Sequence, residues 1–236
     1  MAIAFAPIDI DVKLPDEKIL LEYIEKYKVV GSTWDIGPVL SRMQDNEWRD
    51  MPTALSALYN RYNTGNDTYR YANGIDELMP EIPYMLNQLP FKKLTVVVLF
   101  KQTAQVNHHY DPHTSDVYED HSEIEIELEP RRYNILLTKH NTSSFFVSDN
   151  TDKKIHPVLT KERPAFAFCE RYHYHGADYI GPDKVMLSVF GILDREKHKE
   201  MISNSVRKYP NEVIRFTDPD NPFDPKHQFK EKYPPY

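Results

Sequence analysis

The pattern of apolar and polar residues changes character near residue 91. In the first ninety residues, apolar side chains recur at intervals of three and four, which is the spacing of one face of an α-helix. The clearest examples are Leu20, Tyr23, Ile24 and Tyr27, and then Leu55, Leu58, Tyr59 and Tyr62. From residue 91 onwards, short apolar or alternating runs follow one another without a helical period. The pattern predicts a mostly helical segment, 1–90, followed by a β-rich core, 91–193.

The ends of the predicted helices carry start and stop signals. Pro15-Asp16-Glu17 predicts a helix start, with a proline and two acids in the first turn, and Gly31 is a plausible stop. A third helical run lies between Pro80 and Pro90. Asp194 is expected to cap a last helix, 195–208, before a proline-rich, charged tail without regular structure.

The predicted strands are short and closely spaced. Leu94 to Phe100 is apolar and β-branched, as in a buried strand, and Glu123 to Glu129 alternates strictly, as in a strand with one wet face. Further candidates are 133–138, 144–148, 154–158, 164–174 and 185–193. This arrangement predicts a sandwich or jelly-roll barrel rather than alternating strands and helices.

Composition narrows the classes of function. The chain of 236 residues suits a single domain, and its net charge of −7 argues against nucleic acid or an anionic membrane as partner. The only cysteine is Cys169, so no internal disulfide can form and a reducing, cytoplasmic location is expected. No apolar run reaches the ~20 residues of a membrane span. No glycine lies between Gly74 and Gly176, and no phosphate-binding glycine motif is present.

The segment Asn107-His-His-Tyr-Asp-Pro-His113 follows the apolar strand and carries the most distinctive chemistry. Residues two apart in an extended chain project to the same face, so His109 and Asp111 are expected side by side. An imidazole and a carboxylate on one strand are two thirds of the two-histidine, one-carboxylate face that binds non-haem Fe(II). The adjacent His108 is expected to be structural or to support the ligands without binding the metal.

A distal imidazole could complete this face. His173 and His175 follow the apolar strand 165–168 and alternate on one face, and both are candidates for the third ligand. His175 is preferred because Gly176 would let backbone or a ligand approach closely. Nine residues later, Lys184 opens another apolar strand. A buried ammonium is costly without a partner, which indicates a site for a carboxylate.

His109-Tyr110-Asp111-Pro112, a distal His175 and a basic residue nine positions on resemble the Fe(II)- and 2-oxoglutarate-dependent oxygenases. The nearest branches are the prolyl-hydroxylase-like and aspartyl/asparaginyl-hydroxylase-like proteins. The resemblance spans about 94–193 and implies a double-stranded β-helix, a cupin-like jelly roll, buttressed by N-terminal helices. It also implies that Fe(II) is bound by His109, Asp111 and His175, and that 2-oxoglutarate binds as cosubstrate, with ascorbate as a possible assay component.

The resemblance assigns the far carboxylate of 2-oxoglutarate to Lys184. Lysine stands here where the family often has arginine, and it binds a carboxylate as a point charge without the bidentate fork. Arg131 or Arg132 could serve instead or assist. Tyr133 and Asn134 lie on a strand that could face the site, where either could hydrogen-bond the cosubstrate; ordinary packing is the alternative for both.

Two other functions fit the same residues. One is a metal-binding cupin whose chemistry does not need 2-oxoglutarate, and the other is a jelly-roll binding module without catalysis. The expected substrate is a small molecule or an amino-acid side chain, and neither it nor the oligomeric state follows from the sequence. The acidic stretch 116–129 would suit a basic peptide or amine, but a solvated strand face explains it equally well.

Overall fold

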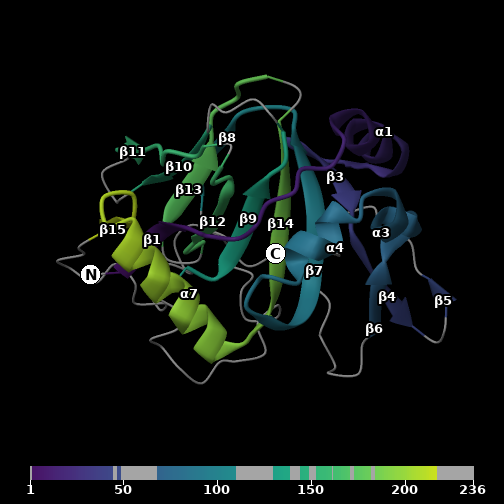
Figure 1. The fold of residues 1–236 in the computed structure, drawn as a ribbon. Helices are drawn as coiled ribbons and strands as arrows, with labels where there is room; N and C mark the ends of the chain where they lie inside the picture. Colours follow the sequence, from purple (N-terminus) through teal and green to yellow (C-terminus); the bar gives the residue numbers. More distant parts are fainter. Residues whose placement is uncertain are drawn as a thin grey trace, which may run out of the picture.

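The computed structural model of the protein describes residues 2–44, 47–48, 68–109, 130–138, 144–148, 153–160, 162–170, 173–181 and 184–216. The described chain is mainly β, with antiparallel sheets packed as a sandwich and helices against one side (Figure 1). This agrees with the expected fold class at the level of a mainly-β protein with flanking helices.

Eight strands form the large sheet, and every neighbouring pair is antiparallel. Its order is β15 (Ile214–Phe216), β1 (Ala2–Pro7), β12 (Ala165–Phe168), β9 (Arg132–Leu136), β14 (Val185–Leu193), β7 (Phe91–Gln102), β3 (Trp34–Pro38) and β2 (Val29–Val30). The long pair β7 and β14 lies at the centre of Figure 1.

The small sheet packs against one face of the large sheet. Its order is β11 (Lys154–Ile155), β10 (Phe145–Ser148), β13 (Tyr174–Ala177) and β8 (Val106–His109). A third sheet, apart from the sandwich, contains β5 (Glu47–Trp48), β4 (Leu40–Gln44) and β6 (Thr68–Tyr71).

The strands from β7 to β14 pair in a nested way. The first pairs with the last, β8 with β13, β9 with β12, and β10 with β11. Successive strands therefore cross between the large and the small sheet, except at the β10–β11 hairpin. Nesting of this kind brings segments that are remote along the chain directly opposite each other, here residue 109 and residue 175.

The register of β14 separates the two faces of the large sheet. Val185, Leu187 and Val189 belong to the core against the helices, whereas Met186 belongs to the core between the two sheets. We call these the outer face and the inner face. The inner core is rich in aromatic rings, contributed by Phe5, Phe100, Phe145, Phe166 and Phe168.

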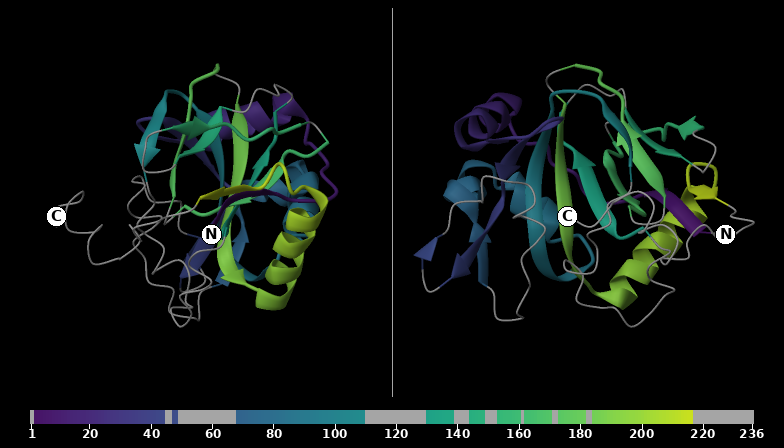
Figure 2. Two further views of the ribbon diagram at one scale, coloured as in Figure 1. Left: turned by 90° about the vertical axis from the view of Figure 1, so that its left-hand side faces the viewer. Right: turned by 180° about the vertical axis from the view of Figure 1, so that it is seen from behind.

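The helices cover the outer face. They are α1 (Glu17–Tyr27), the 3₁₀ turn η1 (Ala72–Gly74), α3 (Ile75–Leu78), α4 (Glu81–Leu86) and α7 (Arg195–Lys208). After a quarter turn, α7 and the blue helices α3 and α4 lie on the same side of the strands (Figure 2, left). The predicted cap at Asp194 is confirmed, because its side chain accepts from the backbone of Lys197. The predicted helix start at 15–17 is also confirmed, with Asp16 as the N-cap that accepts from the backbone of Lys18.

Two expectations about the chain ends are corrected. The segment 1–90 is not mostly helical where it is described, because it contains β1 to β6, and three of these strands join the large sheet. The tail after Pro210 contains β15, which pairs with β1. The N-terminal strands and β15 are held in their sheets by pairing with strands remote in sequence, which local pattern alone does not reveal. The predicted helix at 55–62 and the acidic strand 123–129 lie outside the described residues.

Candidate metal and cosubstrate site

The site is built around two histidines on neighbouring strands of the small sheet. His109, at the end of β8, lies directly opposite His175 of β13, and their ring centroids are 4.3 Å apart. A shift of register follows, because Ala177 pairs with Val106. A Cβ at Gly176 would lie 2.6 Å from the carbonyl oxygen of Val106. Glycine is therefore needed for β8 to approach β13, as the sequence predicted.

Both rings are oriented by backbone carbonyl oxygens. Nδ1 of His109 lies 2.8 Å from the oxygen of Asn107, and Nδ1 of His175 lies 3.3 Å from that of His173. A carbonyl oxygen only accepts, so each ring carries its proton on Nδ1. The Nε2 atoms are then the basic nitrogens, which is the arrangement of most metal-binding histidines.

His175 projects into the space between the sheets. Its ring packs 4.9 Å from that of Phe168 on the facing sheet, and it is buried. His108 lies on the opposite side of β8, with its ring 4.9 Å from that of Phe146, in keeping with a structural role. His173 is also buried, but its ring packs against Phe216 of β15. Burial, with a smaller effect of His175, lowers the pKa of His173 to about 4.

The third predicted ligand, Asp111, lies outside the described residues. Within the described part of the chain, no group of three His, Cys, Asp or Glu side chains is placed to hold a metal ion. The described residues thus contribute two imidazoles, one buried and one partly buried, and their spacing and tautomers fit a metal that takes nitrogen ligands.

Lys184 lies on the inner face, just before β14. Its backbone oxygen accepts from Gln102, and the alternation through Met186 puts its side chain on the same face as the inner core. The side chain is 4% exposed, and its ammonium donates to the hydroxyl of Ser144. No ion pair joins Lys184 to a carboxylate within the described residues. Burial lowers the pKa of Lys184 from 10.5 to about 8, and the more distant Asp178 offsets this only in part.

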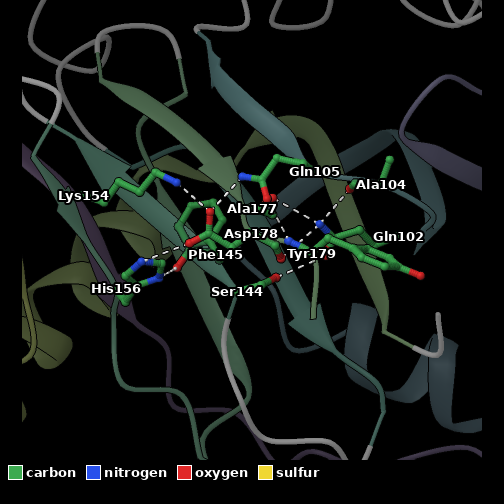
Figure 3. Close-up of polar contacts among 10 residues, drawn as sticks. All are labelled: Gln102, Ala104, Gln105, Ser144, Phe145, Lys154, His156, Ala177, Asp178 and Tyr179. Carbon is green, nitrogen blue, oxygen red and sulfur yellow. Dashed lines mark hydrogen bonds and ion pairs between the residues drawn. The ribbon is translucent and has the colours of Figure 1, made fainter. Parts of the chain in front are cut away.

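The amide of Gln102 ties the Lys184 end of the sandwich together. Its Oε1 accepts from Ser144 at 3.1 Å, and its Nε2 lies 3.1 Å and 3.2 Å from the carbonyl oxygens of Ala177 and Asp178 (Figure 3). A third carbonyl, that of Ala104, lies at 3.0 Å. Gln102 is completely buried. One side chain therefore connects β7, β10 and the end of the strand that carries His175.

Asp178 connects the same end of the sandwich through partly exposed side chains. Its carboxylate accepts from Lys154 at 2.6 Å and from Gln105 at 2.7 Å, and His156 lies 3.3 Å away (Figure 3). Burial alone would raise the pKa of the Asp178 carboxyl, but these hydrogen bonds outweigh it and hold the pKa below its usual value.

Arg132 and Asn134 also lie on the inner face. Nε of Arg132 donates to Ser188 at 3.0 Å and lies 3.7 Å from the carboxylate of Glu170, and its guanidinium stacks 4.5 Å from the ring of Phe190. Asn134 is opposite Ser188 and is 1% exposed. Its Oδ1 has no hydrogen-bond partner in the described part of the chain. A buried acceptor of this kind fits a site that receives a ligand or water.

Tyr133 does not face the histidines. It alternates with Arg132 and Asn134, and it belongs to the outer core. Its hydroxyl lies 2.6 Å from Nδ1 of His198 on α7, and its ring contacts Phe91. The expectation that Tyr133 hydrogen-bonds a cosubstrate is therefore corrected. Arg131, the alternative cation, precedes β9, and its backbone donates to the oxygen of Phe168.

Comparisons with known proteins do not name a family. No protein-family model matches the chain, and no curated protein matches it. Among the described helices, none has the length and apolar character needed to cross a membrane.

Sequence reasoning missed Gln102, Ser144 and Glu170. Ser144 and Glu170 stand at the ends of short strands, and Gln102 ends a long one, positions where polar residues are usually exposed. The only signal for Gln102 was a neutral amide two residues after a strongly apolar run, beyond Lys101.

Proposed function

We propose that this protein is an Fe(II)- and 2-oxoglutarate-dependent oxygenase built on a double-stranded β-helix. The fold part of the proposal is supported by the nested pairing of β7 to β14, in which successive strands cross between two sheets except at the β10–β11 hairpin. Nested pairing of this kind is what a jelly roll requires.

The observation that carries the activity is the facing pair of the partly buried His109 and the buried His175, with a buried ammonium on the facing sheet. The two Nε2 atoms would bind the iron, and Asp111, two residues beyond His109, would be the third ligand. When bound, iron and 2-oxoglutarate would let the site use dioxygen to hydroxylate a C–H bond: one oxygen atom would enter the substrate as the hydroxyl group, and the other would enter succinate as CO2 is released.

Lys184 is the better candidate for the far carboxylate of 2-oxoglutarate. Arg132 already lies beside Glu170, whereas the described carboxylates leave Lys184 without an ion pair. Ser144, which accepts from the Lys184 ammonium, also accepts from the backbone amide of Asp178, three residues after His175. Three residues of strand amount to about 10 Å, so the separation between Lys184 and the histidines along the strand suits a short dicarboxylate bound at both ends. Arg132 and Asn134 would then assist nearer the histidines.

The substrate side of the proposal is coarser. A small molecule or an amino-acid side chain, free or in a protein, suits an oxygenase site of this kind, and we infer neither nucleic acid nor membrane as partner. A cytoplasmic location follows from the same reasoning on the single cysteine.

The test is aerobic succinate formation with Fe(II), ascorbate and 2-oxoglutarate, screened against candidate substrates. Asp111→Ala is expected to lose iron binding and turnover. Native iron stoichiometry and a native rate in this variant would contradict the assignment of Asp111. A metal that binds only the folded protein must raise its melting temperature. A metal-dependent rise without succinate would point to a cupin with other chemistry, and no rise at all would point to a binding module.

A further inference from the structure

The buried glutamine at the Lys184 end, Gln102, has no part in the proposed chemistry, yet its amide is hydrogen-bonded at both ends. Its two amide hydrogens serve the carbonyl oxygens of Ala104, Ala177 and Asp178, and its oxygen accepts from Ser144. A side chain that is fully buried and bonded at both ends of its amide has one position only.

Gln102 is linked to the cation through a single hydroxyl. The ammonium of Lys184 donates to Ser144, and Ser144 in turn donates to Gln102. Lysine side chains are flexible, and an ammonium has no preferred direction of approach to a carboxylate. In this protein, the hydrogen bond to Ser144 fixes the orientation of the Lys184 ammonium. The position of the Lys184 ammonium is thus set by the position of the Gln102 amide.

The same amide is linked to the strand of the histidines. Ala177, which accepts from Nε2 of Gln102, is two residues after His175 on β13. Gln102 therefore holds the cation and the histidine strand at a fixed separation. A ligand bound by the metal at one end and by Lys184 at the other must match that separation.

We infer that Gln102 is a positioning residue that, through Ser144, fixes the distance between Lys184 and the histidine pair and so selects the length of the dicarboxylate cosubstrate. The inference rests on the proposed function, because the ligand is taken to be a 2-oxo dicarboxylate. It assigns a specificity role to Gln102 and Ser144, neither of which needs to touch the metal.

The experiment compares 2-oxoglutarate with 2-oxoadipate, which is one methylene longer. Discrimination by one methylene is commonly about 10- to 200-fold in kcat/KM. The native protein is expected to prefer 2-oxoglutarate within that range. Gln102→Met keeps the volume but removes the amide, and Ser144→Ala removes the link to Lys184. Both are expected to reduce the preference by roughly tenfold, mainly through KM, because the lost interaction is ground-state binding.

Gln88→Met is the matched control. Gln88 also bonds backbone groups at both ends of its amide, to Asp11 and to the carbonyl of Tyr84, but in the helical layer. It is expected to keep the native preference. If Gln102→Met does not fold, Ser144→Ala decides alone. Lower melting temperatures with an unchanged preference would reduce Gln102 to a structural role and overturn the inference.

A second readout separates this inference from the proposed function. Glutarate lacks the keto group, so it can bind Lys184 without turnover, and it is expected to raise the melting temperature of the native protein but not of Ser144→Ala. If the native protein forms no succinate yet responds to glutarate in this way, the oxygenase is wrong and the dicarboxylate site stands. If neither native nor variant responds to glutarate while succinate forms, the role of Ser144 and Gln102 is wrong.

Discussion

The large sheet buries both of its faces, but the two faces bury different chemistry. The outer face, against the helices, is mostly aliphatic, and its Tyr133 is bonded to His198. The inner face carries phenylalanine rings and, between them, Lys184, Gln102, Arg132 and Asn134. Burying a polar group costs free energy unless it is fully bonded. The outer face is what stability alone would select, and the polar inner face is what the proposed ligand would require.

The histidine pair gives the largest expected contrast between the faces. His175→Ala removes an imidazole from the proposed metal site, whereas His198→Ala removes a buried imidazole from the outer face. Loss of an outer-shell partner already costs about 10- to 100-fold in metal affinity, so loss of a ligand should exceed about 100-fold. Titration with Co(II), followed by its visible spectrum, measures this. His198→Ala is expected to lose stability and keep Co(II) affinity, and equal Co(II) affinity in both variants would remove the histidine pair from the proposal.

Two crowded glycines extend the comparison. A Cβ at Gly176 would press on Val106 between β13 and β8, and one at Gly191 would lie 3.0 Å from Cα of Leu94 between β14 and β7. Both alanine variants should lose roughly 1 to 3 kcal/mol of unfolding free energy through overpacking. Only Gly176→Ala should also weaken Co(II) binding, since it separates the strands of His109 and His175. Urea denaturation and the Co(II) titration together check this. Weaker Co(II) binding by Gly191→Ala would contradict the assignment of the metal site to the small sheet.

Lys184 predicts a pH dependence that comes from the inner face. Its folded pKa of about 8 lies below the usual 10.5, so between these values the unfolded chain binds more protons than the folded one. Stability therefore rises with pH across this window, by about 2 kcal/mol from pH 7.5 to 9.5 for this group. Burial raises the pKa of Tyr23 to about 12, which affects stability only above pH 10.

The measurement is the unfolding free energy of the native protein and of Lys184→Met at both pH values. The variant should lack the rise, and Lys18→Met, which removes an exposed lysine, should keep it. Added glutarate should flatten the native rise, because a carboxylate partner stabilises the charged ammonium. A rise that survives in Lys184→Met would place its origin in another group.

The sequence predicted those features whose interacting residues are close together along the chain, and it missed those whose partners are remote. Asp16 and Asp194 act within one helical turn, and the sequence located both helix starts, with Asp194 predicted as the cap. His109 and Lys184 were identified by spacing, and the structure puts the first opposite His175 and the second on the inner face. Gln102 and Ser144 were missed because their partners are 75 and 40 residues away in sequence. Strand β15 was missed because only its pairing with β1 makes it a strand.

Tyr133 is a residue for which the sequence did not reveal which face of the sheet it lies on, and its substitution gives the smallest expected effect. The sequence made both Tyr133 and Asn134 candidates for a hydrogen bond to the cosubstrate, but neighbouring residues of a strand face opposite ways, and only one of them can line the site. Tyr133→Phe should cost about 1 kcal/mol by removing the hydrogen bond to His198. It should leave the KM for 2-oxoglutarate unchanged, whereas Asn134→Ala should raise it. If Tyr133→Phe raises that KM while Asn134→Ala does not, the inner and outer faces have been assigned the wrong way round.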